Sequence, residues 1–274
     1  MRTIEAMLVK DQVCVVTGGA HGIGRALAER FAAEGARAVV VADLDMAAAQ
    51  QVAAGFGGLA IACDVAVEAD LVHVLDTVEY AYGPIGLFCS NAGIAIDGGL
   101  ETSDANWDRI MRINFMSHVW LARHLVPRML RNGGGALLQT VSAAGLLTQL
   151  GSAPYAVSKH AALSLAEWLA VTYGARGLKV FALCPQGVRT ALLEAASQGS
   201  MSFLMETALE PAEVAEAVVE GLAQEQFLIL PHPEVAEYFR RKATDYDRWL
   251  RGMQRLQTET GIEKLMIGYG IPAK

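Results

Sequence analysis

Residues 13–24 read VCVVTGGAHGIG, and this stretch decides the fold. Apolar and β-branched residues predict a short buried strand, and a glycine-rich turn joins it directly to a helix. Glycine lets the backbone turn tightly and approach a ligand with no Cβ in the way. The helix N-terminus offers free N–H groups to a pyrophosphate. We predict a dinucleotide-binding turn here; a tight turn without a ligand is the alternative.

The rest of the chain continues this alternation of short apolar strands and alanine- and leucine-rich helices. Strands are predicted at Val13–Thr17, Ala38–Asp43, Leu59–Cys63, Leu87–Ser90, Ala136–Val141, Lys179–Leu183 and Phe227–Leu230. Helices are predicted at Gly22–Glu34, Asp45–Ala54, Glu68–Tyr82, Asp104–Asn132, Pro154–Ala175 and Pro211–Gln224. The strands show little in–out alternation, which is typical of strands buried on both faces. We expect an α/β fold with a Rossmann-like, doubly wound, mostly parallel seven-stranded sheet and helices on both faces.

The 274 residues fit one domain, since no Pro-, Ser- or Gly-rich linker divides them. We expect a single domain over 1–274, with a lid at about 190–211 and a C-terminal helical extension at about 231–274. The extension carries apolar and aromatic residues at helical spacing. Packing on the body or on a neighbouring subunit is the simpler interpretation of it, and a share in a substrate pocket is the alternative.

Composition narrows the class of protein. A net charge of −7 argues against nucleic acid as a partner, because nucleic-acid binding needs a basic surface. No apolar run reaches the roughly 18 residues of a membrane span, and the charged N-terminus lacks the apolar core of a secretion signal. We expect a cytoplasmic protein without a membrane partner or a metal. Its four cysteines lack metal-ligand spacing and are expected to be reduced core thiols, at Cys14, Cys63, Cys89 and Cys184.

Asp43 ends the second predicted strand, AVVVAD. A carboxylate at this position accepts hydrogen bonds from the adenosine ribose and repels a 2′-phosphate. No Arg or Lys lies in the glycine turn or directly after Asp43, so the sequence favours NAD over NADP. Capping of the next helix is the alternative role for Asp43, and Asp45 is better placed for it.

Three later residues form a candidate reaction centre. Tyr155 and Lys159 are four apart at the start of a predicted helix, so their side chains share one face. Ser142 follows the strand GALLQTV and lies on the same rim as the glycine turn. A lysine ammonium lowers the pKa of a nearby tyrosine, which otherwise is near 10 and makes a poor base. Ser142 is placed to hold a substrate oxygen beside Tyr155, so the sequence predicts a proton-transferring tyrosine.

These residues together resemble the short-chain dehydrogenase/reductase family in its compact single-domain form, from about Asp11 to Leu230. The motifs that carry the resemblance are TGGAHGIG at Thr17–Gly24, Asp43, CDV at Cys63–Val65, NAG at Asn91–Gly93, Asn114, Ser142, YAVSK at Tyr155–Lys159 and PQGVRT at Pro185–Thr190. The resemblance implies a catalytic tetrad of Asn114, Ser142, Tyr155 and Lys159, in which Asn114 holds a water that connects Lys159 to solvent.

The resemblance also implies a cofactor site. It assigns cofactor contacts to Gly18, His21, Gly22, Ile23, Gly24, Asp43, Asp64, Val65, Asn91, Ala92, Gly93, Tyr155, Lys159, Pro185, Gly187, Val188 and Thr190. In one departure, the family usually has Pro-Gly where this chain has Pro185-Gln186. Gln186 is either a shifted, solvent-facing loop residue or a hydrogen-bonding partner of the substrate. In another, the chain continues past the last strand into the extension, where many relatives end in a glycine-rich segment.

The lid region is apolar and has no Arg or Lys beyond Arg189. We therefore expect an apolar, aromatic or polycyclic alcohol or ketone as the substrate, contacted by Ser142, Ala144, Gln149, Tyr155, Gln186, Leu192, Leu193, Met201, Phe203 and Met205. The long apolar helices predict a homodimer or homotetramer, as in relatives. The expected function is an NAD-dependent oxidoreductase of secondary alcohols. An NADPH-dependent carbonyl reductase and a non-catalytic dinucleotide sensor are the alternatives.

Overall fold

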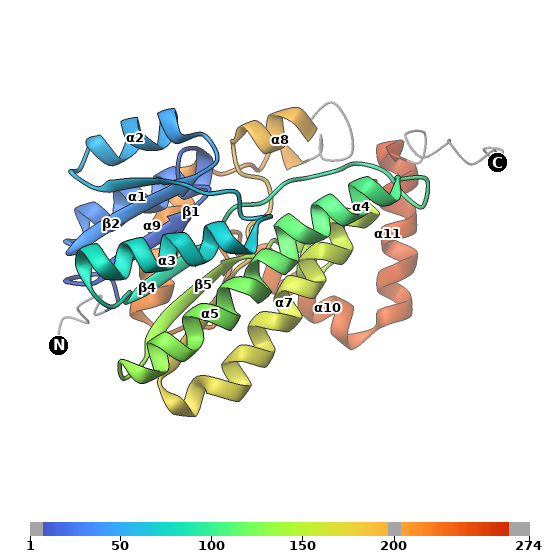
Figure 1. The fold of residues 1–274 in the computed structure, drawn as a ribbon. Helices are drawn as coiled ribbons and strands as arrows, with labels where there is room; N and C mark the ends of the chain where they lie inside the picture. Colours follow the sequence, from blue (N-terminus) through green and yellow to red (C-terminus); the bar gives the residue numbers. More distant parts are fainter. Residues whose placement is uncertain (1–7, 197–203, 263–274) are drawn as a thin grey trace.

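The computed structural model describes residues 8–196 and 204–262, and these form a sheet covered by helices on both faces (Figure 1). All seven strands are parallel, in the order β3-β2-β1-β4-β5-β6-β7. The strands are β1 Val13–Thr17, β2 Ala38–Asp43, β3 Leu59–Ala62, β4 Leu87–Ser90, β5 Gly135–Thr140, β6 Leu178–Leu183 and β7 Leu228–Ile229. The predicted fold class is confirmed. Strands β1, β2 and β4 have the predicted bounds, and the other four differ by one residue at one or both ends.

The helices alternate with the strands. Their bounds are α1 Gly22–Ala33, α2 Met46–Ala54, α3 Glu68–Tyr82, α4 Asp104–Met111, α5 Ser117–Arg131, α6 Ala143–Leu146, α7 Ala153–Tyr173, α8 Ala191–Ala196, α9 Pro211–Ala223, α10 Glu234–Thr244 and α11 Tyr246–Thr260. A 3₁₀ turn, η2, follows α7 at Gly174–Arg176. Among the residues described, no helix combines the length and the apolar character that a bilayer span requires.

The two faces of the sheet carry separate hydrophobic cores. Val13 and Val15 point into the core that α3, α5 and α7 cover, whereas Cys14 and Val16 point into the core under α1, α2 and α9. Figure 1 shows α3, α5 and α7 in front of the sheet and α1 and α9 behind it. Because successive side chains of a strand point to opposite faces, a strand buried on both sides reads as an unbroken apolar run. All four cysteines are buried in these cores and unpaired.

One predicted helix is interrupted. The stretch predicted as a single helix over Asp104–Asn132 contains a π-helical segment, η1, at Arg112–Met116, between α4 and α5. A π segment adds one residue to a helical turn and is found most often at functional sites. Here it carries Asn114, which is fully buried. The sequence pattern could not reveal the interruption, because apolar residues continue at helical spacing through it.

The sheet order reverses direction between β1 and β4, which are neighbours although β2 and β3 intervene in the chain. In an open parallel sheet, this reversal opens a crevice at the carboxyl ends of the strands. The glycine turn after β1 and the NAG segment after β4 lie at this edge.

The extension is tied to the body at two points. His232 is buried, and its Nδ1 accepts a hydrogen bond from the backbone N–H of Gln186 at 3.2 Å. Lys242 on α10 is also buried, and its Nζ donates to the carbonyl oxygens of Leu146 and Leu147 at 2.7 and 3.4 Å. Thr148, the next residue, has a φ of +112°, which is strained for a β-branched residue. Lys242 therefore stabilises the corner that follows α6.

We expect Lys242→Met to lower the free energy of unfolding by about 1–3 kcal/mol, because it leaves two buried carbonyl groups without their donor. Urea unfolding measures this, with Arg251→Met as the control, since Arg251 is exposed on α11. The control should change stability by less than about 0.5 kcal/mol. Equal stability of the two variants would show that Lys242 does not hold the corner.

Candidate active site

The crevice is one continuous cavity of about 1410 Å³ that runs from the glycine turn to the extension. Sites for single small ligands usually measure about 300–1,000 Å³. The cavity is therefore large enough for a dinucleotide together with a second ligand. Its walls include the carboxyl ends of the strands, the start of α7, the lid around α8, and one face of α10 and α11.

The glycine turn presents a bare helix end to this cavity. His21 is the N-cap of α1, but its side chain makes no capping hydrogen bond, and the first turn holds no acidic residue. The N–H groups of that turn are therefore not capped by a side chain. Gly18 has a φ of +62°, and a Cβ there would lie 2.9 Å from the Cα of Ala92. Such a cradle fits a pyrophosphate, because the helix dipole and free N–H groups both favour an anion.

Two other glycines let the walls of the cradle approach each other. Gly22 has a φ of +49°, and a Cβ there would lie 2.9 Å from Cγ2 of Thr190, across the cavity. Gly24 does not line the cavity. A Cβ on Gly24 would meet the carbonyl oxygen of Gly18 at 2.0 Å, so this glycine allows α1 to pack closely against the turn.

Asp43 joins the glycine turn to the start of α2. One of its carboxylate oxygens accepts from the backbone N–H of Ala20 and the other from that of Asp45, each at 2.9 Å. A carboxylate has about four acceptor positions, so it keeps capacity for ribose hydroxyls. Asp45 caps α2 by accepting from the N–H of Ala48 at 3.1 Å, as predicted. Asp43 lines the cavity together with Leu44, Asp64 and Val65, none of which carries a positive charge.

Asn91 ties the glycine turn to the centre of the sheet. Its side-chain amide donates to the carbonyl oxygens of Thr17 and Gly18 at 3.0 and 3.3 Å, and its side-chain oxygen accepts from the Thr140 hydroxyl at 3.0 Å. Ala92 and Gly93 follow it along the cavity wall. The remaining predicted cofactor residues also line the cavity, namely His21, Ile23, Pro185, Gly187, Val188 and Thr190.

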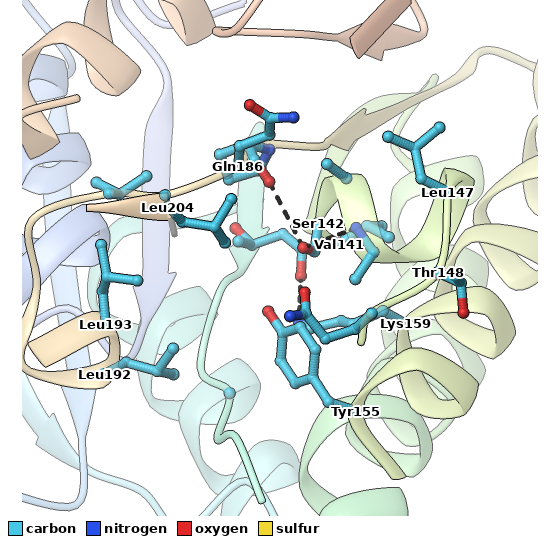
Figure 2. A pocket seen from close by; sticks show the side chains of 18 of the residues that line it. Val141, Ser142, Leu147, Thr148, Tyr155, Lys159, Gln186, Leu192, Leu193 and Leu204 are labelled. Carbon is cyan, nitrogen blue, oxygen red and sulfur yellow. Dashed lines mark hydrogen bonds between the residues drawn. The ribbon is translucent and has the colours of Figure 1, made fainter. Parts of the chain in front are cut away.

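Ser142, Tyr155 and Lys159 converge on the middle of the cavity (Figure 2). The Ser142 hydroxyl donates to the carbonyl oxygen of Pro185 at 3.5 Å, accepts from the N–H of Ala144 at 3.1 Å, and is hydrogen-bonded to Tyr155. Lys159 donates to the carbonyl oxygen of Thr140 at 2.9 Å, and its Nζ lies 5.7 Å from the centre of the Tyr155 ring. The structure thus brings these three predicted residues together.

Burial governs the acid–base properties of this centre. It raises the pKa of Tyr155 above its ordinary value, and the hydrogen bond between Tyr155 and Ser142 opposes that shift. Burial lowers the pKa of Lys159 to about 8. His118 lies deeper, and burial and the charge of Lys159 lower its pKa to about 3, so it stays neutral. The tyrosine therefore stays protonated until further positive charge reaches it.

Asn114 lies behind the site and does not line the cavity. Its side-chain amide donates to the carbonyl oxygen of Ile94 and to the Ser158 hydroxyl, and its side-chain oxygen accepts from the N–H of Ile94. A Cβ on Gly93 would lie 3.3 Å from this oxygen and 3.4 Å from Nζ of Lys159. Asn114 therefore fixes the backbone that passes between it and Lys159. Its predicted role in holding a water stays a prediction.

The predicted substrate residues fall into three groups. Those that line the cavity are Ser142, Ala144, Gln149, Tyr155, Gln186, Leu192 and Leu193. Met205 instead packs against the small core around Tyr155 and Leu193. Met201 and Phe203 lie outside the described residues. In Figure 2 the Gln186 amide points away from Tyr155, whereas Leu192, Leu193 and Leu204 face the centre from the lid side.

Comparison with known proteins agrees with this geometry. The family model for short chain dehydrogenases matches residues 12–200. The chain belongs to the short-chain dehydrogenase family. It is 33% identical over 239 residues to 1-deoxy-11-beta-hydroxypentalenate dehydrogenase of Streptomyces exfoliatus, covering 83% of this chain and 86% of that protein.

Two further relatives of this short-chain dehydrogenase are informative. Meso-2,3-butanediol dehydrogenase of Serratia marcescens is 32% identical over 228 residues, covering 80% of this chain and 90% of that protein. A short-chain dehydrogenase/reductase from Burkholderia phymatum, solved in complex with NAD, matches with a TM-score of 0.79 and 29% identity. The match covers 87% of this chain and 95% of that one. The protein is thus an oxidoreductase of the class that acts on hydroxyl and ketone groups.

The sequence did not reveal part of the cavity wall. α10 and α11 line the cavity with residues such as Tyr238, Arg248 and Trp249, so the extension packs on the body and also forms part of the cavity wall. Arg109 of α4 also lines it. The lid has no Arg or Lys beyond Arg189, whereas Arg109 of α4 and Arg248 of α11 line the cavity. The amphipathic spacing of α10 and α11 is equally typical of helices that only pack on the body, so the sequence could not show that they line the cavity.

Lys159 makes stability depend on pH in a definite direction. Between pH 8 and 10.5 the unfolded chain still holds the proton that folded Lys159 has lost, so stability rises with pH across this window. From pH 7.5 to 9.5 we expect the free energy of unfolding to rise by about 2 kcal/mol relative to Lys159→Met. Urea unfolding at both pH values checks this. Lys179→Met, at a partly exposed position on β6, should show no such change, and a shift of the opposite sign would contradict the assignment.

Proposed function

We propose that the protein is an NAD-dependent dehydrogenase that interconverts a secondary alcohol and a ketone on a substrate with an apolar body. The observation that carries the proposal is the convergence of Ser142, Tyr155 and Lys159 in the same cavity as the uncapped glycine turn. The apolar side chains of Leu193 and Leu204, which pack in the same small core as Tyr155, support an apolar substrate.

The bound dinucleotide would supply the hydride acceptor, and Gly18, Gly22, Asp43 and Thr190 would hold it. The chain's own residues then handle the proton. Ser142 holds the substrate oxygen beside the Tyr155 oxygen. Tyr155, once its phenolic proton has passed to solvent, takes the alcohol proton as the carbon loses hydride. In the reverse direction the same hydroxyl returns the proton to the forming alkoxide.

Lys159 supplies the charge that makes this proton transfer feasible. Its ammonium group is buried beside the Tyr155 ring and is fixed by the Thr140 carbonyl, so it is screened little by water. A nearby cation stabilises the phenolate over the phenol and opposes the effect of burial on Tyr155. Exclusion of water strengthens this interaction, since the local dielectric is low.

We further propose a homo-oligomer that pairs α5 and α7 across a two-fold axis. Three large apolar residues on α7 support this, because they are exposed in the single chain: Val157, Trp168 and Val171. Val171, in the last turn of α7, is 86% exposed, and an exposed apolar patch of this kind is typical of a protein–protein interface.

Replacing the tyrosine tests the catalytic assignment. We expect Tyr155→Phe to reduce kcat at least about a hundredfold, because general acid–base catalysis typically contributes 10²–10⁴-fold. NAD binding should change less than threefold, as measured by quenching of protein fluorescence. Tyr173→Phe, at the far end of α7, should leave both values unchanged. Turnover of Tyr155→Phe within tenfold of wild type would refute the role of Tyr155 and favour a dinucleotide sensor.

Replacing Asp43 tests the preference for NAD over NADP. We expect kcat/KM for NAD to exceed that for NADP at least tenfold, because the carboxylate repels a 2′-phosphate at short range. Asp43→Asn removes the charge and should lower the ratio of kcat/KM for NAD to that for NADP at least fivefold. Asp45→Asn is the matched control, since Asp45 is half exposed and its charge is screened. A wild-type preference for NADP would instead support the carbonyl reductase.

A further inference from the structure

The extension places one face of each of its two helices against the cavity. The lining residues of α11 recur at intervals of three and four, as Asp245, Arg248, Trp249, Gly252, Met253, Arg255 and Leu256. This spacing marks a single helical face. α10 contributes Tyr238 and Arg241 in the same way. One face of the extension therefore forms a continuous part of the cavity wall.

Two arginines on this wall have no carboxylate partner among the described residues. Arg248 and Arg255 are seven residues apart on α11, so they lie on the same face two turns from each other. By contrast, Arg240 and Arg241 both pair with Glu237 on α10. Among the other acids on this wall, Asp245 caps α11 by accepting from the backbone N–H of Arg248, and Glu234 lies in the first turn of α10.

The two ends of the cavity therefore differ in charge. The cofactor end carries the carboxylates of Asp43 and Asp64, while the extension lines its end with four arginines against three carboxylates, those of Glu234, Glu237 and Asp245. Between the arginines of α11 lie Trp249 and Met253, which are half-buried. An occupant of this end would meet an apolar surface flanked by guanidinium groups.

The wall is also fixed relative to the catalytic centre. Lys242 connects α10 to the carbonyls of Leu146 and Leu147, and α6 begins directly after Ser142. His232 connects the start of the extension to Gln186, which lines the cavity near Ser142. α11, which follows α10 after the turn at Asp245, is thus placed with respect to the serine that holds the reacting oxygen.

We infer that Arg248 and Arg255 bind a carboxylate on the substrate, at the end remote from the reacting carbon. The inference rests on the proposed function and narrows its substrate to an apolar hydroxy or keto acid. A planar guanidinium matches a carboxylate with two parallel hydrogen bonds. A phosphate is favoured less, because the N-terminus of α11, which could help bind one, is already capped by Asp245.

The test uses a bicyclic ketone with and without the charge. The probes are 6-acetyl-2-naphthoate and its methyl ester, offered to the full-length protein with NADH. Isothermal titration gives the affinity of each probe, and loss of NADH absorbance gives kcat and KM. The variants are Arg248→Gln, Arg255→Gln and the double variant. Arg251→Gln is the matched control, because Arg251 is on the same helix but does not line the cavity.

We expect the wild-type protein to bind the carboxylate at least tenfold more tightly than the ester, with a correspondingly lower KM. The preference should fall to about one in the double variant and persist in Arg251→Gln. Equal affinity for the two probes in wild type, including no measurable binding of either, overturns the inference, as does a preference that survives in the double variant. If the carboxylate is preferred but neither probe is reduced, the arginine site stands and the proposed function fails.

Discussion

The spacing between the cofactor cradle and the reaction centre depends on a series of buried and partly buried hydrogen bonds across the carboxyl edge of the sheet. Asn91 holds the backbone of the glycine turn with its amide and the Thr140 hydroxyl with its oxygen. The carbonyl oxygen of Thr140 in turn accepts from Lys159. Hydride transfer requires the reacting groups to be placed within a few tenths of an ångström. A rigid polar chain between neighbouring strand ends provides such placement, whereas an apolar contact permits sliding.

The same series of hydrogen bonds explains how the ammonium group of Lys159 is held in a buried position. Lys159 is 3% exposed and lowers the pKa of His118 behind it, and no carboxylate pairs with it among the described residues. Burial of an unpaired charge is costly, and the carbonyl of Thr140 offsets only part of this cost. The group is thus destabilised in the free protein. A phenolate at Tyr155 would supply the missing negative charge, so the destabilisation favours the ionised state that proton transfer needs.

Local signals in the sequence were sufficient for the sheet and most of the site. A strand end or a glycine turn is recognised from neighbouring residues in the sequence. The places of Thr17–Gly24, Asp43 and Ser142 in the site could therefore be predicted from their positions at strand ends. Asn114 could be singled out as an unusual helix-interior residue, but the π segment that buries it depends on packing against Ile94 and Ser158. The role of Gly24 also depends on packing. The motif predicted a cofactor contact, whereas in the structure the absence of a Cβ lets α1 pack closely against the glycine turn.

The position of the extension could not be predicted from local features of the sequence. Its amphipathic pattern shows that each helix has a buried face, but not what that face meets. That depends on two long-range contacts, His232 with Gln186 and Lys242 with the end of α6, which join residues 46 and 96 apart in the chain. A buried lysine that donates to carbonyls is indistinguishable in sequence from a solvated one on an exposed face. Once these contacts fix α10, the short turn at Asp245 directs α11 along the cavity, and its arginines become part of the site.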